Sequence, residues 1–227
     1  MDRGLYIAAS GMLAELARQD QLANDLANAS TPGYKADRAA QHSFGQLLVR
    51  NMNGEAVGTT ATGARLERQV TDLSAAPLRQ TDEPLDLAVD GDGYFAVRTS
   101  QGVRYTRNGQ FTAAANGTLT DQMGNPVLGQ NGTPVKINAD GTVAAGAVGI
   151  FALTNVAKAG DSTFTGTAAG RGRGTVRTGA LEESGVDAAH TMVEMMASLR
   201  AFEAGQKAIT TIDETLDRAS GQVGSIR

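Results

Sequence analysis

The sequence contains no cysteine and no tryptophan, and only 4% of its 227 residues are aromatic. A chain without thiols excludes disulfides, zinc–thiolate sites, iron–sulfur clusters and thiol nucleophiles. Few aromatic side chains lower the expectation of a small-molecule pocket, because aromatic residues usually line such pockets. These absences point away from an enzyme, although they do not exclude one.

Long apolar runs are missing as well. None approaches the roughly 18–20 residues that a membrane-spanning helix requires. Near the N-terminus, Glu15, Arg18 and Asp20 interrupt what would be the apolar core of a secretory signal peptide. The net charge is −4 and the 20 basic residues are scattered, which argues against a nucleic-acid partner. We expect no membrane insertion, and export, if it occurs, by a route other than a cleaved signal.

The usual catalytic and metal-binding motifs do not occur. Neither His42 nor His190 has an acidic pair at metal-ligand spacing. The EF-hand spacing fails because Tyr94 occupies a ligand position in the run that contains Asp86, Asp90 and Asp92. We therefore expect no catalytic residue, no cofactor, no metal and no small-molecule substrate.

Both ends of the chain carry an apolar pattern with alternating spacings of three and four residues, which is typical of packed helices. The first seam comprises Leu5, Ala9, Met12, Leu16, Gln19, Ala23 and Leu26. The second comprises Met192, Met195, Leu199, Phe202, Gln206, Ile209, Asp213 and Leu216. A capping-box-like pair, Ser184 and Asp187, stands before the second seam. Two such helices most simply pack on each other or on neighbouring copies.

The end of the first seam is unusual because Asn24 and Asn28 fall on one helical face. Asn costs about 0.5–0.7 kcal/mol relative to Ala inside a helix. The run Ser30-Thr31-Pro32-Gly33 then stops the helix. We interpret the two amides as packing groups, with a solvated helix face as the alternative. The predicted assembly residues are Leu5, Met12, Leu16, Asn24, Leu26, Asn28, Met192, Met195, Leu199, Phe202, Ile209 and Leu216.

The middle of the chain is rich in glycine and in turn signals. Seventeen of the 28 glycines fall between Gly91 and Gly179, which excludes long helices there. Short β-type runs separated by turn dipeptides predict a compact antiparallel β domain. The predicted strands are 85–89, 94–98, 103–106, 110–112, 118–120, 135–137 and 150–153.

These patterns predict an α+β protein in which N- and C-terminal helices form a coiled-coil layer beside a central antiparallel β-rich domain. An inner helical domain would comprise an N-terminal helix (1–36) and a C-terminal helix (181–220). The remaining parts would be an extended polar arm (37–80) with one strand at 64–71, the β-rich domain (81–156), a polar return loop (157–180) and a tail (221–227).

Three motifs now resemble a known family. Residues 24–35 (NDLANASTPGYK) resemble the N-terminal signature of bacterial flagellar rod and hook proteins. Residues 84–97 (PLDLAVDGDGYFAV) and 105–111 (YTRNGQF) are similar to the β domain of those subunits. The C-terminal signature is matched by 181–187, 192–196, 200–204 and 212–216. The matches lie in the same order as in the family and cover both ends and the centre.

This resemblance implies a structural axial subunit of the flagellar basal body, outside the cytoplasmic membrane. In this family, terminal helices surround a central channel, and subunits leave the cell through the flagellar type III export apparatus. The implied partners are other copies, related rod subunits and that apparatus. The short middle and the opening Met1-Asp2-Arg3 look more like a proximal rod protein than a distal rod or hook-like one. From another class, the alternative is a secreted β-domain adhesin or binding module with oligomerising helices.

Overall fold

The computed structural model describes residues 2–43, 47–50, 56–60, 64–160 and 162–224. It divides into two compact units. The helical unit comprises Met1–Leu26, Asp37–Val70 and Ala188–Arg227, and the β unit comprises Ala27–Ala36 and Thr71–Asp187. Each unit is therefore assembled from segments that are far apart in the sequence. The predicted α+β class is confirmed, with one helix near each end and antiparallel strands between them.

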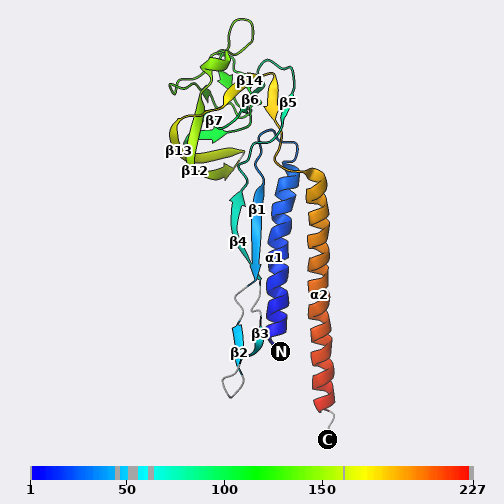
Figure 1. Ribbon diagram of the computed structural model, residues 1–227. Helices are drawn as coiled ribbons and strands as arrows, with labels where there is room; N and C mark the ends of the chain where they lie inside the picture. The colour runs from blue at the N-terminus through cyan, green and yellow to red at the C-terminus, as the bar shows by residue number, and fades with distance from the viewer. Residues whose placement is uncertain (1, 44–46, 51–55, 61–63, 161, 225–227) are drawn as a thin grey trace. The chain divides into compact units, whose positions relative to one another are not determined.

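Helices α1 (Asp2–Ala27) and α2 (Ala188–Gly224) lie side by side in the helical unit (Figure 1). Their contacts show that they run antiparallel. Arg18 Nη2 lies 3.7 Å from Glu194 Oε2, and Ser198 Oγ donates to Glu15 Oε2 at 2.6 Å. No helix in the described part of the chain is both long enough and apolar enough to cross a bilayer.

Helix α2 begins later than the sequence predicts and extends further. Ser184 lies four residues before its first turn, so the prediction of a capping box there is wrong. The hydroxyl of Ser184 instead donates to the carbonyl of Asn28 at 2.9 Å. The helix continues to Gly224, into the predicted tail, whose last residues 225–227 lie outside the described residues.

In both helices the inward-facing residues recur with the predicted spacing of three and four. At every second position, however, the residue that faces inward is the one before the predicted residue. The inner side of α2, half-buried or buried, contains Thr191, Met195, Ser198, Phe202, Gly205, Ile209, Ile212 and Leu216. On α1 the corresponding positions are Leu5, Ala8, Met12, Glu15, Gln19, Leu22 and Leu26. Half of the predicted seam is therefore confirmed, and the other half is displaced by one residue. The displaced inner positions are mostly small or polar, which lets the helix backbones approach closely.

The segment between α1 and the β unit is more regular than the expected polar arm. Strand β1 (Asp37–Ser43) pairs with β4 (Ala64–Thr71), and β2 (Leu47–Arg50) pairs with β3 (Ala56–Thr60). Only β4 is predicted from the sequence. The other three strands satisfy their backbone groups through ladder bonds in a stretch whose composition carries no clear strand pattern.

The β unit contains eleven strands within the described residues. They are β5 (Leu78–Gln80), β6 (Leu87–Asp90), β7 (Tyr94–Thr99), β8 (Gly102–Thr106), β9 (Thr112–Ala113), β10 (Leu119–Thr120), β11 (Val127–Leu128), β12 (Ile150–Gly160), β13 (Thr163–Arg171), β14 (Thr175–Thr178) and β15 (Ala180–Glu182), with a short 3-10 turn at Ala145–Ala147. The main sheet has the order β11-β7-β12-β13-β8, and β7 also pairs with β8. Strands β7, β12, β13 and β8 thus close a small ring, and β5–β15, β6–β14 and β9–β10 form antiparallel pairs beside it.

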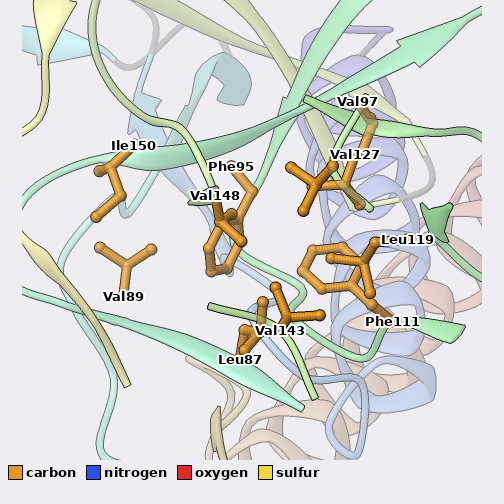
Figure 2. Packing of buried hydrophobic residues seen from close by; sticks show 11 residues of the cluster. Leu87, Val89, Phe95, Val97, Phe111, Leu119, Val127, Val143, Val148 and Ile150 are labelled. Atoms are coloured by element: carbon orange, nitrogen blue, oxygen red, sulfur yellow. The ribbon is translucent and has the colours of Figure 1, made fainter. Parts of the chain in front are cut away.

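Strand β7 separates two apolar clusters because successive side chains of a strand point to opposite faces. Phe95 and Val97 enter the larger cluster, where Phe95 packs edge-on against Phe111 with ring centroids 5.3 Å apart (Figure 2). Tyr94 and Ala96 enter the smaller cluster. The larger cluster also contains Leu87, Val89, Leu119, Val127, Val135, Val143, Val148 and Ile150.

Most of the described residues between 157 and 180 belong to strands β12, β13, β14 and β15, where the sequence predicts a polar loop. In β13 only Phe164 is buried, so the segment lacks the repeated apolar alternation that marks a strand. Ladder bonds to β12 and β8 hold it in place. Conversely, the predicted strand 135–137 is reduced to an isolated bridge between Thr118 and Lys136.

The close approach of the helices makes a prediction about Gly205. A Cβ atom there would lie 2.7 Å from Met12 Cγ, whereas a Cβ at Gly221 meets nothing within 4 Å. We expect Gly205→Leu to destabilise the helical unit by about 1–3 kcal/mol through overpacking. Gly221→Leu, in the same helix, should not destabilise it. Denaturation followed by circular dichroism at the helical band measures both; equal stability of the two variants contradicts the close approach.

Candidate assembly surface and buried junction

The segment that follows α1 folds as a tight turn and then enters the β unit. The amide of Thr31 donates to the Asn28 carbonyl at 3.1 Å, and Thr31 Oγ1 donates to Asn28 Oδ1 at 3.2 Å. Gly33 has a φ of 67°, in the left-handed region that favours glycine. Helix α1 ends at Ala27, before the run Ser30-Thr31-Pro32-Gly33 that the sequence predicts as its stop, and residues 28–33 form turns.

Gly33 lies directly against the backbone that follows β8. A Cβ atom at Gly33 would lie 2.3 Å from the carbonyl carbon of Arg107 and 2.5 Å from the nitrogen of Asn108. The amide of Gly33 donates to the carbonyl of Glu182 at 2.9 Å. This glycine is thus required twice, once for its φ and once because no side chain fits.

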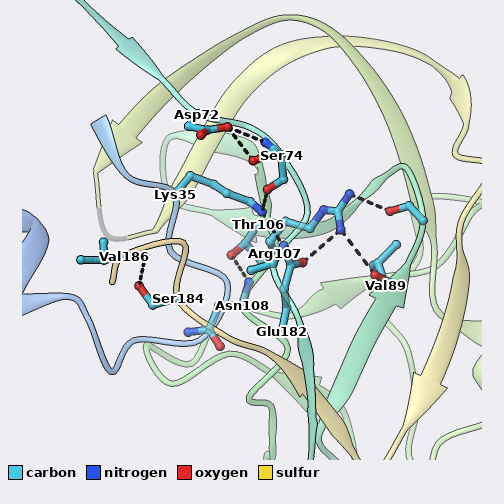
Figure 3. A network of polar contacts seen from close by, with 12 residues as sticks. Lys35, Asp72, Ser74, Val89, Thr106, Arg107, Asn108, Glu182, Ser184 and Val186 are labelled. Carbon is cyan, nitrogen blue, oxygen red and sulfur yellow. Dashed lines mark hydrogen bonds and ion pairs between the residues drawn. The ribbon is translucent and has the colours of Figure 1, made fainter. Parts of the chain in front are cut away.

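Three buried charges meet beside this glycine (Figure 3). Glu182 Oε1 accepts from Lys35 Nζ at 2.6 Å, and Glu182 Oε2 accepts from Arg107 Nη1 at 3.0 Å. The side chains of Lys35 and Glu182 are 1% exposed and that of Arg107 is 5% exposed. We call these three residues the buried ion triad.

Backbone groups complete the triad. Lys35 Nζ also donates to the Ser74 carbonyl at 2.6 Å, and Arg107 Nη2 donates to the Gly91 carbonyl at 2.9 Å. The amide of Ala76 donates to Glu182 Oε1 at 3.0 Å. A buried ion pair is favourable only when such further bonds offset the loss of hydration, so the triad depends on all of these segments together.

Two aromatic rings lie next to the triad and contact cations. The Arg107 guanidinium is 5.1 Å from the centroid of the Tyr94 ring. Burial raises the pKa of the Tyr94 hydroxyl, while the charge of Arg107 partly lowers it. Lys158 Nζ lies 4.0 Å from the centroid of the Tyr34 ring and donates to the Lys35 carbonyl at 2.9 Å. Strand β12 thereby covers the turn that contains Tyr34.

A polar recess of about 230 Å³ opens on the β unit near the same turn. Its lining consists mostly of amides and hydroxyls: Asn28, Thr31, Thr106, Asn108, Gln110, Gln122, Ser162 and Thr163, together with Asp121 and Met123. The carboxylate of Asp121 is already bonded to the amide groups of Met123 and Asn125. The recess therefore presents mainly neutral hydrogen-bonding groups beside one carboxylate whose oxygens already accept hydrogen bonds, and its lining holds no set of acid, base and nucleophile.

The outer faces of both helices carry bulky apolar side chains. On α2, Met192, Val193, Met196 and Leu199 are about half exposed, between 48% and 59%. On α1 the exposed apolar residues are Tyr6, Ile7, Leu13 and Leu16. Contiguous exposed apolar residues of this kind mark interaction surfaces. We call the α2 group the outer apolar face.

The predicted assembly residues fall into three groups. Those turned inward within the chain are Leu5, Met12, Leu26, Met195, Phe202, Ile209 and Leu216. Those exposed on the outer sides are Leu16, Asn24, Met192 and Leu199. Asn28 is half-buried and bonds within its own chain through Thr31 and Ser184. A role of these residues in assembly stays a prediction.

Sequence reasoning missed the buried ion triad. Lys35, Arg107 and Glu182 all stand inside the family motifs, but no local pattern pairs residues that are 147 and 75 positions apart. A lysine at the end of a glycine turn is usually exposed, so its burial had no signal in the sequence. Among the described residues, no group of His, Asp and Glu is placed to hold a metal ion.

Comparison with known proteins identifies the family. Three family models match: flagella basal body rod protein over residues 5–35, flagellar hook protein FlgE/F/G D1 domain over 88–145, and flagellar basal body rod FlgEFG protein C-terminal over 177–221. The chain is 31% identical to the flagellar basal-body rod protein FlgG of Bacillus subtilis, over 95% of this chain and 97% of that protein. The chain belongs to the flagellar basal-body rod and hook family.

Within this family, the relatives carry more than one name. The FlgF rod protein of Salmonella typhimurium is 32% identical over 97% of this chain and 98% of its own length. The FlgF of Caulobacter vibrioides is 29% identical over the full length of both chains. The family is one of structural flagellar proteins, so the predicted flagellar family and its structural character are confirmed at that level.

The Gly33 contact gives a testable consequence with a matched control. Gly117 has a similar φ of 72°, but a Cβ there meets nothing within 4 Å. Gly117→Ala should therefore destabilise the β unit only by about 1–2 kcal/mol, for the backbone strain. We expect Gly33→Ala to destabilise it by about 3 kcal/mol or more, because the new methyl group overlaps the Arg107 backbone.

Urea denaturation followed by tyrosine fluorescence measures the two free energies of unfolding. Equal losses for the two variants would show that strain alone accounts for the glycine and that the backbone contact has no energetic role.

Proposed function

We propose that this chain is an axial structural subunit of the flagellar basal-body rod and not an enzyme. The observation that carries the proposal is the outer apolar face of α2, together with the exposed apolar residues of α1. A monomer leaves this surface in water, so its burial favours association with further helices. Because the chain belongs to a family of flagellar rod proteins, we take those further helices to be the helices of neighbouring subunits.

The exposed apolar residues of the two helices support one mode of assembly. The apolar residues of α1 and α2 are different sets, and neither repeats the other. A contact between two unlike patches is heterologous, and repeated heterologous contacts build open helical assemblies instead of closed dimers. We propose that the terminal helices pack in this way with other copies and related rod subunits, as a coiled-coil layer around a channel.

The inner seams and the outer faces then have different tasks. The inner seam holds α1 against α2 within one subunit, through contacts such as that between Met12 and Gly205. Met192 and Leu199 would contact neighbouring subunits, and the thioether of Met192 adapts to irregular surfaces. In the isolated monomer, we expect the two helices to fray, because long amphipathic helices gain most of their stability from packing.

Export and subtype complete the proposal. Export would use the flagellar type III apparatus, and the subunit would stand outside the cytoplasmic membrane without insertion or nucleic acid. We favour a proximal rod position over a distal or hook-like one because the middle of the chain is short.

The outer apolar face is tested by replacing Met192, Met196 and Leu199 with Gln. We expect the triple variant to fold, since all three side chains are about half exposed, and to lose assembly into the rod because its apolar contacts are removed. The measurement is swimming of a strain that lacks the wild-type gene, together with immunoblots of purified basal bodies.

Exposed apolar residues of the β unit provide the control. Met123 is 65% exposed and Val103 is 47% exposed. The Met123→Gln, Val103→Thr variant should retain motility and incorporation. Full motility of the helix variant, or an equal loss in both variants, would contradict the proposed surface.

A further inference from the structure

Within the β unit, the segment that follows α1 and the segment that precedes α2 lie side by side. Lys35 lies eight residues beyond the end of α1, and Glu182 lies in β15, six residues before α2 begins. Their side chains meet at 2.6 Å although 147 positions separate them. The segment 27–36 and the segment 180–187 are therefore neighbours through the buried ion triad.

The charges in this triad are unequal. Two cations, Lys35 and Arg107, share the one carboxylate of Glu182, from opposite oxygens. Without that carboxylate, a buried ammonium and a buried guanidinium would stand side by side with no counter-charge between them. Two neighbouring cations without a counter-charge are strongly unfavourable here, because the side chain of Lys35 is 1% exposed and that of Arg107 is 5% exposed.

Hydrogen bonds that involve the backbone also join segment 27–36 to segment 180–187. The Gly33 amide donates to the Glu182 carbonyl at 2.9 Å, and the Gly185 amide donates to the Tyr34 carbonyl at 2.9 Å. The Ser184 hydroxyl donates to the Asn28 carbonyl at 2.9 Å. Segment 27–36 thus finds a counter-ion, an acceptor and two donors on one short stretch of the C-terminal side.

We propose that the buried ion triad is a latch that docks segment 27–36 and segment 180–187 onto the β unit together or not at all. Until β15 has paired with β5, Lys35 has no counter-charge and the N-terminal segment stays undocked. A chain that stops before Glu182 would leave segment 27–36 undocked even though the cluster around Phe95 and Phe111 is complete. This inference concerns folding within one chain and does not rest on the proposed rod function.

Hydrogen exchange of single backbone amides in the full-length protein tests the latch. The amide of Gly33, bonded to the Glu182 carbonyl, reports on segment 27–36. The amide of Glu183, bonded to the Pro77 carbonyl and not to segment 27–36, reports on segment 180–187. The amides of Leu119 and Val135 report on the remainder of the β unit. In Glu182→Gln, we expect exchange at Gly33 and Glu183 to rise about 100-fold or more, with Leu119 and Val135 changed by less than about threefold.

The neighbouring carboxylate is the matched control. Glu183 is exposed, so Glu183→Gln should leave all four exchange rates unchanged. Lys35→Met then tests the reciprocal direction. It removes the cation from the N-terminal segment and keeps the pair of Glu182 with Arg107, and it should still accelerate exchange at the Glu183 amide, on the C-terminal side.

Two results overturn the proposal. If Lys35→Met accelerates exchange at Gly33 and not at Glu183, the two segments dock independently. If all four amides accelerate equally in Lys35→Met, the triad is a general stabiliser of the β unit and not a latch. Should Glu182→Gln fail to fold, the Lys35→Met result alone decides between these outcomes.

Discussion

The carboxylate of Glu182, held between Lys35 and Arg107, is the interaction that joins the N-terminal and C-terminal segments of the β unit. Burial of two cations is tolerated only because one carboxylate and several backbone carbonyls satisfy them. The three residues come from the first, middle and last parts of the chain. Their pairing therefore draws the N-terminal turn, the end of β8 and strand β15 into one discontinuous unit. Gly33 permits this closeness, since any side chain there would overlap the Arg107 backbone.

The helices show what a sequence pattern can and cannot determine. Spacings of three and four residues predicted both helices and half of the inner seam, because the period follows from helix geometry. The phase was wrong at alternate positions, where Ser198 and Gly205 turn inward and Leu199 turns outward. An apolar scale favours Leu199 over Ser198 for the inner side. Close packing of two backbones favours the smaller residue, and this preference depends on a partner helix that the local sequence does not reveal.

The β unit shows the same limit in another form. Tyr94–Thr99 was predictable because its side chains alternate between two apolar clusters. Strand β13 was not, since Phe164 alone is buried and the rest of the strand is small or polar. It is a strand because β12 and β8 supply hydrogen-bond partners on both sides. The buried ion triad was the least predictable feature. The sequence around each of its residues gives no sign of burial or pairing, and the three meet only in the folded chain.

The discontinuity of the β unit defines what can be exchanged between members of the family. A graft of the central residues 81–156 alone would carry Arg107 away from both Lys35 and Glu182. A transferable module has to begin near Ala27 and include Asp187, so that the turn, the ring of strands and β15 move as a set. Natural recombination within genes of this kind faces the same restriction. Crossovers inside the central region of this chain separate the three charges, whereas crossovers at the helix boundaries keep them together.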